Sequence, residues 1–428
     1  MTTAPLTRLA QDHAAGRKRG IPSICSAHPV VIEAALLQGR IDGGPVLIEA
    51  TCNQVNQEGG YTGMTPADFR RFVEAIDDKV GFDRQQLILG GDHLGPNPWK
   101  HLRPDEALGR AEVMIDAYLR AGFTKIHLDT SMGCAGETAA LADAITAERA
   151  ARLARASEAA AVGSGFDRPV YIIGTEVPIP GGAMEVVDHL QVTTPAAAME
   201  TVEVHRQAFA RLGLEAAFER AIGIVVQPGV EFGNANVVFY DRGAARDLSA
   251  VLAKMPQFVF EAHSTDYQTP AALAALVRDH YAILKVGPGV TFALREALWA
   301  LDAIEAETLP SADRAALRAA TLARMHAEPA NWRKYYHATG AALDFQLDYS
   351  LSDRIRYYWP DAEIAAAQEK LFANLRQAPP PLALVSQYLP LAYAAVRAGR
   401  ATLDPAELAM AHIAATLDAY HGACFPDA

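Results

Sequence analysis

Eight short apolar runs rich in valine and isoleucine recur along the chain. Most of them do not alternate polar and apolar residues, which is typical of strands buried on both faces, as in a parallel sheet. The runs lie at residues 22–27, 46–50, 87–91, 125–129, 170–174, 222–227, 258–262 and 282–287. The pattern therefore predicts eight parallel strands.

Amphipathic helical patterns stand between these runs. In the stretch 65–81, Thr65 is suited to cap a helix and Pro66 to occupy its first position, and the apolar residues that follow fall on one helical face. The stretch 193–213 has the same pattern, with Thr194 as the capping residue, Pro195 at the first helical position and a glycine at the end. Strands therefore alternate with helices along the chain.

Eight strands, each followed by a helical stretch, are what a (β/α)8 TIM barrel requires, and we predict this α/β fold. The alternative is a doubly wound open sheet, which needs a glycine-rich dinucleotide fingerprint that this sequence lacks. No further valine- and isoleucine-rich run follows residue 309. We therefore expect the barrel with its active site in residues 1–309, and a helical extension packed on it in residues 310–428.

Composition narrows the class of protein. The 428 residues carry a formal net charge of −12 and no basic run, which argues against nucleic-acid binding. The first 20 residues lack the apolar segment of a signal peptide, and no apolar run reaches the roughly 18 residues of a membrane helix. The four cysteines are scattered without CxxC spacing, which favours a reduced compartment. We expect a cytoplasmic protein with no membrane partner.

Polar side chains gather where the predicted strands end, which is where TIM barrels place their active sites. They are His28, Thr51, Asn53, Gln54, Asp92, His93, His127, Asp129, Ser131, Glu176, Gln227, Glu231, His263, Asp266 and Lys285. Buried charges are costly unless they are paired or bind a metal. So many polar and charged side chains at one end of a barrel predict a functional site.

Asp92 and His93 stand side by side at the end of the third run. Adjacent strand residues point to opposite sides, but the backbone turns at a strand end and both can reach the barrel mouth. We predict that His93 binds a divalent metal and that Asp92 acts as acid or base; otherwise, Asp92 caps a turn and His93 is a core histidine. With His263 and Glu176, the ligands would suit Zn²⁺ or Mn²⁺, although Glu176 can equally anchor its loop.

Other candidates concern the substrate. Lys285 can form a Schiff base, although an ion pair or a contact to phosphate or hydroxyl is favoured. His127 lies inside a strand and is expected in the core. The loops after the last two strands fall where barrels often bind phosphate, and the arginines of 350–360 are expected in cation–π contacts rather than on the substrate. The predicted substrate-binding residues are Asn53, Asp129, Ser131, Gln227, Ser264, Asp266, Gly287 and Gly289.

Long motifs stand in order from about residue 20 to about residue 420. They are CSAHPVVIEAAL, LIEATCNQVNQEGGYTGMTPADF, GGDHLGPN, KIHLDTSMGCAG, IGTEVPIPGG, VVQPGVEF, EAHSTDYQ, LKVGPGVTFALREA, SLSDRIRYYWP and SQYLP. Together they resemble the tagatose-bisphosphate aldolase Z-subunit family. Members of this family have been labelled non-catalytic subunits of a class II aldolase, or tagatose-6-phosphate kinases, and similar proteins act alone as ketose-phosphate 4-epimerases.

The resemblance implies a zinc site with three histidines and a nearby catalytic aspartate, as in class II aldolases. GGDH resembles the aldolase Asp–His pair and EAHS a later metal histidine, whereas Gln227 stands in place of the strand-six histidine. A mixed site that uses Glu176 or Gln227 stays open. The kinase label does not fit, because the chain has no phosphate-binding GxxxxGK[ST] loop.

Two functions follow from these expectations. The first is a metal-dependent 4-epimerase that interconverts tagatose 6-phosphate and fructose 6-phosphate in galactitol or tagatose catabolism, with Asp92, Glu176 and Lys285 as catalytic groups. The second is an accessory subunit that stabilises the catalytic chain of a class II tagatose-1,6-bisphosphate aldolase. The polar barrel mouth favours the enzyme, because a scaffold has no reason to gather desolvated carboxylates and histidines. Assembly as a homo-oligomer fits both functions.

Overall fold

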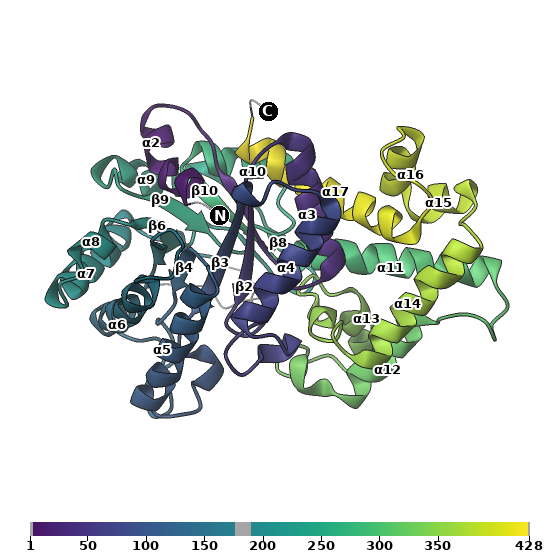
Figure 1. Ribbon diagram of the computed structural model, residues 1–428, viewed down its shortest axis with the longest axis horizontal. Coiled ribbons are helices and arrows are strands. Elements are labelled where there is room, and N and C mark those ends of the chain that lie inside the picture. Colours follow the sequence, from purple (N-terminus) through teal and green to yellow (C-terminus); the bar gives the residue numbers. More distant parts are fainter. Residues whose placement is uncertain (1–2, 176–189, 427–428) are drawn as a thin grey trace.

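The computed structural model describes residues 3–175 and 190–426, and a closed barrel of eight parallel strands forms its centre (Figure 1). The strands are β1 (Ile21–Cys25), β2 (Val46–Thr51), β3 (Leu87–Leu94), β4 (Lys125–Leu128), β5 (Val170–Ile173), β6 (Ala221–Val226), β9 (Val259–Ala262) and β10 (Tyr281–Val286). Because β1 pairs with both β2 and β10, the sheet closes on itself. The predicted TIM barrel is confirmed, and the open doubly wound sheet is wrong.

Helices cover the outside of the barrel. Those that follow the strands are α3 (Pro29–Asp42), α4 (Pro66–Val80), α5 (Pro104–Arg120), α6 (Asp143–Ala161), α7 (Pro195–Arg211), α8 (Glu215–Phe218), α9 (Arg242–Val251), α10 (Pro270–Arg278) and α11 (Pro288–Thr308). A short hairpin of β7 (Glu231–Phe232) and β8 (Val237–Val238) follows β6 and was not predicted.

Helix α4 begins where its sequence predicts. The Thr65 hydroxyl accepts a hydrogen bond from the backbone N–H of Asp68, and the Asp68 carboxylate accepts one from the N–H of Thr65, which makes a capping box. The helix ends at Gly81, whose φ of 65° lies in the left-handed region that glycine adopts at little cost. Thr194 caps α7 in a similar way, through the N–H of Ala197.

The chain beyond α11 is helical among the described residues. It contains α12 (Leu317–Ala327), α13 (Ala341–Tyr349), α14 (Ala362–Gln377), α15 (Leu382–Tyr388), α16 (Pro390–Arg397) and α17 (Pro405–Cys424). Figure 1 shows α11 to α16 beside the barrel, whereas α17 runs back to it. Helix α17 packs against α3, α10 and α11 and so completes the barrel wall next to β1. The division of the chain at residue 309 stays a prediction.

The amino end of the barrel is closed by α1 (Ala4–Thr7) and α2 (Leu9–Ala14). Leu6 and Leu9 are buried in one apolar cluster with barrel residues near the strand starts, among them Ile21, Leu47 and Ile88. Burial of these side chains removes apolar surface from water and fixes the segment beneath the sheet. The barrel interior can therefore open only at the opposite, carboxyl end of the strands.

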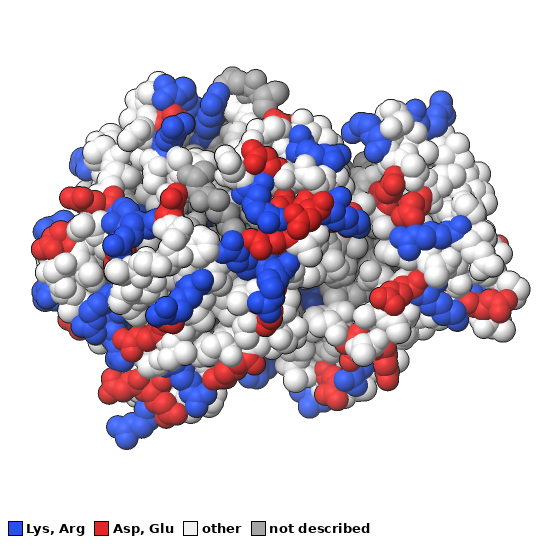
Figure 2. Space-filling view, in the orientation of Figure 1, with Lys and Arg blue, Asp and Glu red and all other residues white. Residues whose placement is uncertain are grey.

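The surface carries both signs of charge. On the face drawn in Figure 2, acidic and basic side chains are interspersed over the barrel helices and the C-terminal helices alike. None of the described helices combines the length and the apolar character needed to cross a bilayer.

Candidate metal and substrate site

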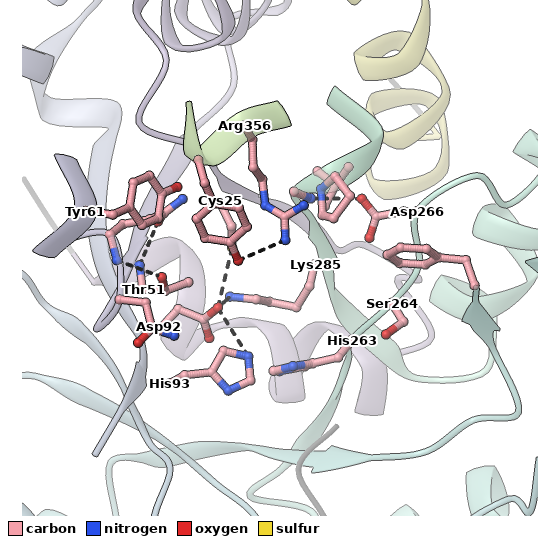
Figure 3. Close-up of a pocket in the computed structure, with 17 residues that line it drawn as sticks. Cys25, Thr51, Tyr61, Asp92, His93, His263, Ser264, Asp266, Lys285 and Arg356 are labelled. Carbon is pink, nitrogen blue, oxygen red and sulfur yellow. Dashed lines mark hydrogen bonds and ion pairs between the residues drawn. The ribbon is translucent and has the colours of Figure 1, made fainter. Parts of the chain in front are cut away.

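A pocket opens at the carboxyl ends of the barrel strands, where the sequence predicts the active site (Figure 3). The empty space in it, together with the open solvent at its mouth, is about 640 Å³. Its walls are Cys25, Thr51, Asn53, Gln54, Tyr61, Asp92, His93, Phe232, His263, Ser264, Asp266, Lys285, Val286, Gly287, Pro288, Arg356 and Tyr357. The barrel strands and their loops supply most of the pocket, and a short 3₁₀ helix of the C-terminal region, η6 (Arg354–Tyr357), supplies one wall.

Three histidines meet at this pocket: one from β3, one from β4 and one directly after β9. His93 and His263 line the pocket, and His127 lies next to them. The ring centroids of His93 and His263 are 4.9 Å apart, and those of His127 lie 5.0 Å from His93 and 5.2 Å from His263. One potential ligand atom from each, together with a carboxylate oxygen of Asp92, lie within 4.8 Å of one another. All four residues are buried. This cluster is a candidate His/Asp metal site.

A buried carboxylate holds one ring nitrogen of each histidine. The pairs are His93 Nδ1 with Asp129 Oδ2 at 2.8 Å, His127 Nδ1 with Asp92 Oδ1 at 2.9 Å, and His263 Nε2 with Glu261 Oε1 at 2.9 Å. Carboxylates in this position fix the tautomer and orientation of metal-binding histidines. The Nε2 atom of His127 is buried and has no hydrogen-bond partner among the described residues. The backbone N–H of His93 also points to His127 Nδ1, at 3.2 Å. In the tautomer whose Nδ1 donates to Asp92, Nε2 is free to bind a divalent cation, and in that tautomer the side chains present fit a metal ion.

The protonation states of Asp92, Asp129 and His263 agree with this assignment. Burial acts to raise the pKa of Asp129, but the hydrogen bond from His93 and its charge lower that pKa to about 2. Burial also opposes ionisation of Asp92, yet the charges of His93 and Lys285 and the hydrogen bond from His127 hold its pKa well below the usual range. Burial lowers the pKa of His263 to about 4. Burial acts in the same direction on His93, but the facing carboxylates of Asp92 and Asp129 raise its pKa, so a metal ion would have to displace a proton from His93. Ionised carboxylates and neutral imidazoles are the forms that bind metals.

The backbone at His93 explains how two neighbouring residues reach one site. His93 has a φ of 48°, in the left-handed region that a residue with a side chain seldom adopts. The pairing of β3 with β4 also shifts register between Gly91 and Leu94. The regular alternation of the strand is therefore broken, and both Asp92 and His93 line the pocket. Ser264 follows His263 with a similar φ of 53°. Such strained conformations cluster at functional sites.

An ionic network fills the barrel interior below the histidines. Lys125 Nζ lies 2.6 Å from Glu49 Oε1 and 2.7 Å from Glu261 Oε2, and the three side chains are fully buried. Lys285 Nζ contacts Glu49 and lies 2.9 Å from Asp92 Oδ2. Burial acts to lower the pKa of each lysine, but the facing carboxylates raise both pKa values above the usual range. The network therefore carries two ammonium groups that fix Glu261 and Asp92.

Loss of Lys125 should destabilise the barrel strongly. The variant Lys125→Met leaves Glu261 without its ammonium partner in a buried site, and we expect the free energy of unfolding to fall by about 3–5 kcal/mol. The matched control is Lys79→Met, which breaks the exposed 2.7 Å pair with Glu33 and should cost less than about 1 kcal/mol. Urea denaturation followed by circular dichroism measures both. Equal losses would contradict the interpretation of the interior network.

The predicted site residues separate into groups in the structure. Asp92, His93, His263 and Lys285 lie together, and Asn53, Ser264, Asp266 and Gly287 also line the pocket. Asp129 and Ser131 lie behind His93, with the Ser131 hydroxyl donating to Asp129 at 2.9 Å. Gly289 is not a lining residue; its N–H donates to Asp266. Glu176 falls outside the described residues, so its role stays a prediction.

Gln227 differs from what the sequence suggests. It does not line the pocket, and its side-chain oxygen accepts hydrogen bonds from the backbone N–H groups of Gly229 and Val230 at 2.8 and 3.0 Å. A side chain whose oxygen is hydrogen-bonded within its own turn is not positioned to take the place of a metal-binding histidine. The third histidine of the candidate cluster is His127, on β4, which was expected in the core.

Sequence reasoning also missed three residues on the far wall of the pocket. They are Tyr61, from the loop after β2, and Arg356 and Tyr357, from η6. The rings of Tyr61 and Tyr357 meet edge to face with centroids 4.7 Å apart. Arg356 belongs to the aromatic- and arginine-rich segment 350–360, for which cation–π packing was favoured over contact with the substrate.

The fold and the site together define the class: a TIM-barrel protein with a candidate His/Asp metal site at the mouth of its barrel. Residues 6–425 match the model of the D-tagatose-1,6-bisphosphate aldolase subunit GatZ/KbaZ-like family, and the chain belongs to that family. Family membership supports an aldolase-related role in carbohydrate metabolism.

Solved structures resemble the chain to different degrees. A protein from Sinorhizobium meliloti 1021, described as a probable tagatose 6 phosphate kinase, is 58% identical, with a TM-score of 0.88 over 95% of this chain and 100% of that one. Fructose-bisphosphate aldolase from Campylobacter jejuni is 14% identical, with a TM-score of 0.47 over 88% of this chain and 94% of that one. The second likeness is too weak to carry an argument about function.

Proposed function

We propose that this protein is a metal-dependent ketose-phosphate 4-epimerase that interconverts tagatose 6-phosphate and fructose 6-phosphate by a retro-aldol route. One observation carries the proposal: three carboxylate-oriented histidines gather around Asp92, and two of them, His93 and His263, line the pocket with it. A catalytic base beside a candidate Lewis-acid site is what cleavage next to a ketone requires.

The metal would be held by His93, His127 and His263, with Glu176 as a further ligand candidate. Imidazole ligands suit Zn²⁺, and a carboxylate added to them also suits Mn²⁺. When bound, the cation supplies Lewis-acid stabilisation of negative charge on the oxygens of the substrate. Asp129 and Glu261 would keep two of the imidazoles in the correct orientation.

The chemistry of the substrate selects the route. In a 2-ketose the hydrogen on C4 is not next to the carbonyl, so it is not acidic and simple deprotonation cannot invert C4. Asp92 instead takes the proton of the C4 hydroxyl, the C3–C4 bond breaks, and its electrons pass to the C2 carbonyl as an enediolate. The released glyceraldehyde 3-phosphate turns its aldehyde face within the pocket. The enediolate then attacks that face, and the new C4 oxygen regains a proton.

Lys285 is a candidate for returning this proton, and Glu176 is the other. Facing carboxylates hold the pKa of Lys285 above its usual range against the opposing effect of burial, so its amine is an ammonium. An ammonium can donate a proton or stabilise an alkoxide, whereas a Schiff base needs the neutral amine. Lys285 therefore acts as a charged group in this proposal.

A second function rests on the family description, which names an aldolase subunit. In this alternative the chain stabilises the catalytic chain of a class II tagatose-1,6-bisphosphate aldolase and does no chemistry itself. The buried, carboxylate-supported histidine cluster favours the enzyme, because potential ligand atoms of three histidines and Asp92 lie within 4.8 Å of one another in it. Activity of the purified chain distinguishes the two.

The purified chain alone, supplied with Zn²⁺ or Mn²⁺, should convert tagatose 6-phosphate to fructose 6-phosphate. EDTA should abolish the activity, and added metal should restore it. In D₂O the product should carry no deuterium at C4, because that hydrogen never leaves its carbon; ¹H NMR measures this. Deuterium at C4 after one turnover would exclude the retro-aldol route. Activity that appears only with an added aldolase chain would favour the accessory subunit.

A further inference from the structure

The C-terminal region places an arginine at the barrel mouth. Arg356 lies on η6 and is one of two lysine or arginine side chains among the described residues that line the pocket; the other is Lys285. Figure 3 shows Arg356 on the opposite side of the pocket from His93 and His263, with Lys285 between them. A ligand held by Arg356 would therefore extend toward the histidine cluster.

The two cations differ in how their charge is compensated. Lys285 contacts the carboxylates of Glu49 and Asp92. Arg356 makes no ion pair with a described carboxylate: Nη1 donates to the carbonyl oxygens of Ser352 and Asp353, and Nη2 donates to the Tyr357 hydroxyl at 3.2 Å. Of the five N–H groups of an arginine, the Nε–H and one Nη2 hydrogen remain for a ligand. The guanidinium is thus anchored, yet still able to bind an anion.

The backbone site where TIM barrels often bind phosphate is already occupied. The N–H groups of Gly287 and Gly289, at the start of α11, both donate to Oδ1 of Asp266, at 2.9 and 2.7 Å. A phosphate at this position would have to displace a carboxylate and would meet its negative charge. The sequence predicts phosphate binding in these loops. In the structure, however, the backbone N–H groups that would bind a phosphate already donate to the carboxylate of Asp266.

We propose that Arg356 is the anion subsite of the pocket and binds the phosphate of the sugar, which rests on the proposed function. Arginine binds phosphate through two parallel N–H···O bonds, which fixes orientation as well as position. The reacting carbons of the sugar would then lie over Asp92 and the histidines. The C-terminal helices thereby determine that the substrate is phosphorylated.

Binding of inorganic phosphate, measured by isothermal titration calorimetry on the full chain, tests the subsite without any turnover. Arg356→Gln should weaken phosphate binding by about 10–100-fold, as expected for the loss of charge-assisted hydrogen bonds. Arg356→Lys keeps the charge but loses the bidentate geometry, and should show a smaller loss. Arg333→Gln, an exposed arginine of the same region, is the matched control and should bind like the wild type. Thermal unfolding checks that each variant is folded.

Steady-state kinetics then test whether the loss of phosphate binding also weakens binding of the sugar phosphate. Arg356→Gln should raise KM for tagatose 6-phosphate by a similar factor. Wild-type phosphate affinity in Arg356→Gln, or no measurable binding by the wild type, would overturn the proposal. Tighter binding in Asp266→Ala with no effect of Arg356→Gln would also overturn it, in favour of the glycine loop. Loss of phosphate binding in a chain without epimerase activity would support the subsite and refute the proposed function alone.

Discussion

Replacement of Asp92 by asparagine should slow conversion of tagatose 6-phosphate by about 10²–10⁴-fold, the usual contribution of a positioned general base. Asparagine keeps the shape of the side chain and can still accept a hydrogen bond from His127, but it cannot take a proton. Lys285 would keep its contact with Glu49, so the variant leaves no isolated ammonium in the barrel. The loss should therefore fall on kcat and leave the fold and the metal content intact.

Metal analysis separates this role from metal binding. Asp92→Asn should retain the stoichiometry of the wild type, whereas His93→Ala should lose its metal. Asp116→Asn, which breaks an exposed pair with Arg120, is the control and should leave turnover unchanged. If Asp92→Asn strips the metal, Asp92 is a ligand and another group is the base. Unchanged turnover would remove Asp92 from the chemistry altogether.

The fold could be predicted because its signals are local. Each barrel strand is buried on both faces and reads as a short apolar run, and the capping threonines mark where α4 and α7 begin. What local patterns did not indicate is the position of α17, which is far along the chain from the barrel yet packs between α3 and α10. Contacts between segments so distant in sequence leave no periodicity to detect.

Part of the site was predictable for a similar reason. His93 and His263 stand at strand ends, where polar residues are conspicuous after apolar runs. His127 was missed because a residue inside a buried strand can face either the barrel interior or the helices. A signal was present: Lys125 and His127 are two residues apart in β4, as Glu261 and His263 are across the end of β9. Side chains at such spacing share one face, so a lysine that needs buried partners predicts an inward histidine.

Arg356 illustrates a second limit of prediction from the sequence. Its segment is aromatic and basic, a composition that packs by cation–π contacts, as Arg354 does over the rings of Tyr335 and Tyr357 at 3.6 and 4.3 Å. Nothing in that pattern indicates that the neighbouring arginine faces a pocket built by strands much earlier in the chain, from β1 to β10. Only the packing of η6 over the barrel mouth shows it.

Replacement of His127 should have the second large effect, a loss of metal affinity. If His127 is a metal ligand, His127→Ala should weaken binding of Zn²⁺ or Mn²⁺ by more than about 100-fold, like His93→Ala and His263→Ala. Asp129→Asn, which removes only the support of His93, should cost about 10–100-fold, the usual effect of an outer partner. Metal affinity by calorimetry and metal content after dialysis measure both. Activity should fall in parallel, because every route through the enediolate needs the same stabilisation.

The control must be a buried histidine outside the cluster. His205 is fully buried on α7 with Nδ1 bonded to the carbonyl oxygen of Thr201 at 2.7 Å, so His205→Ala removes an imidazole of the same burial without touching the site. It should lose stability but keep wild-type metal affinity. Glu176→Gln completes the series and tests the ligand predicted from the sequence. If His127→Ala behaves like His205→Ala while Glu176→Gln loses the metal, the third ligand is Glu176 and His127 serves to position Asp92.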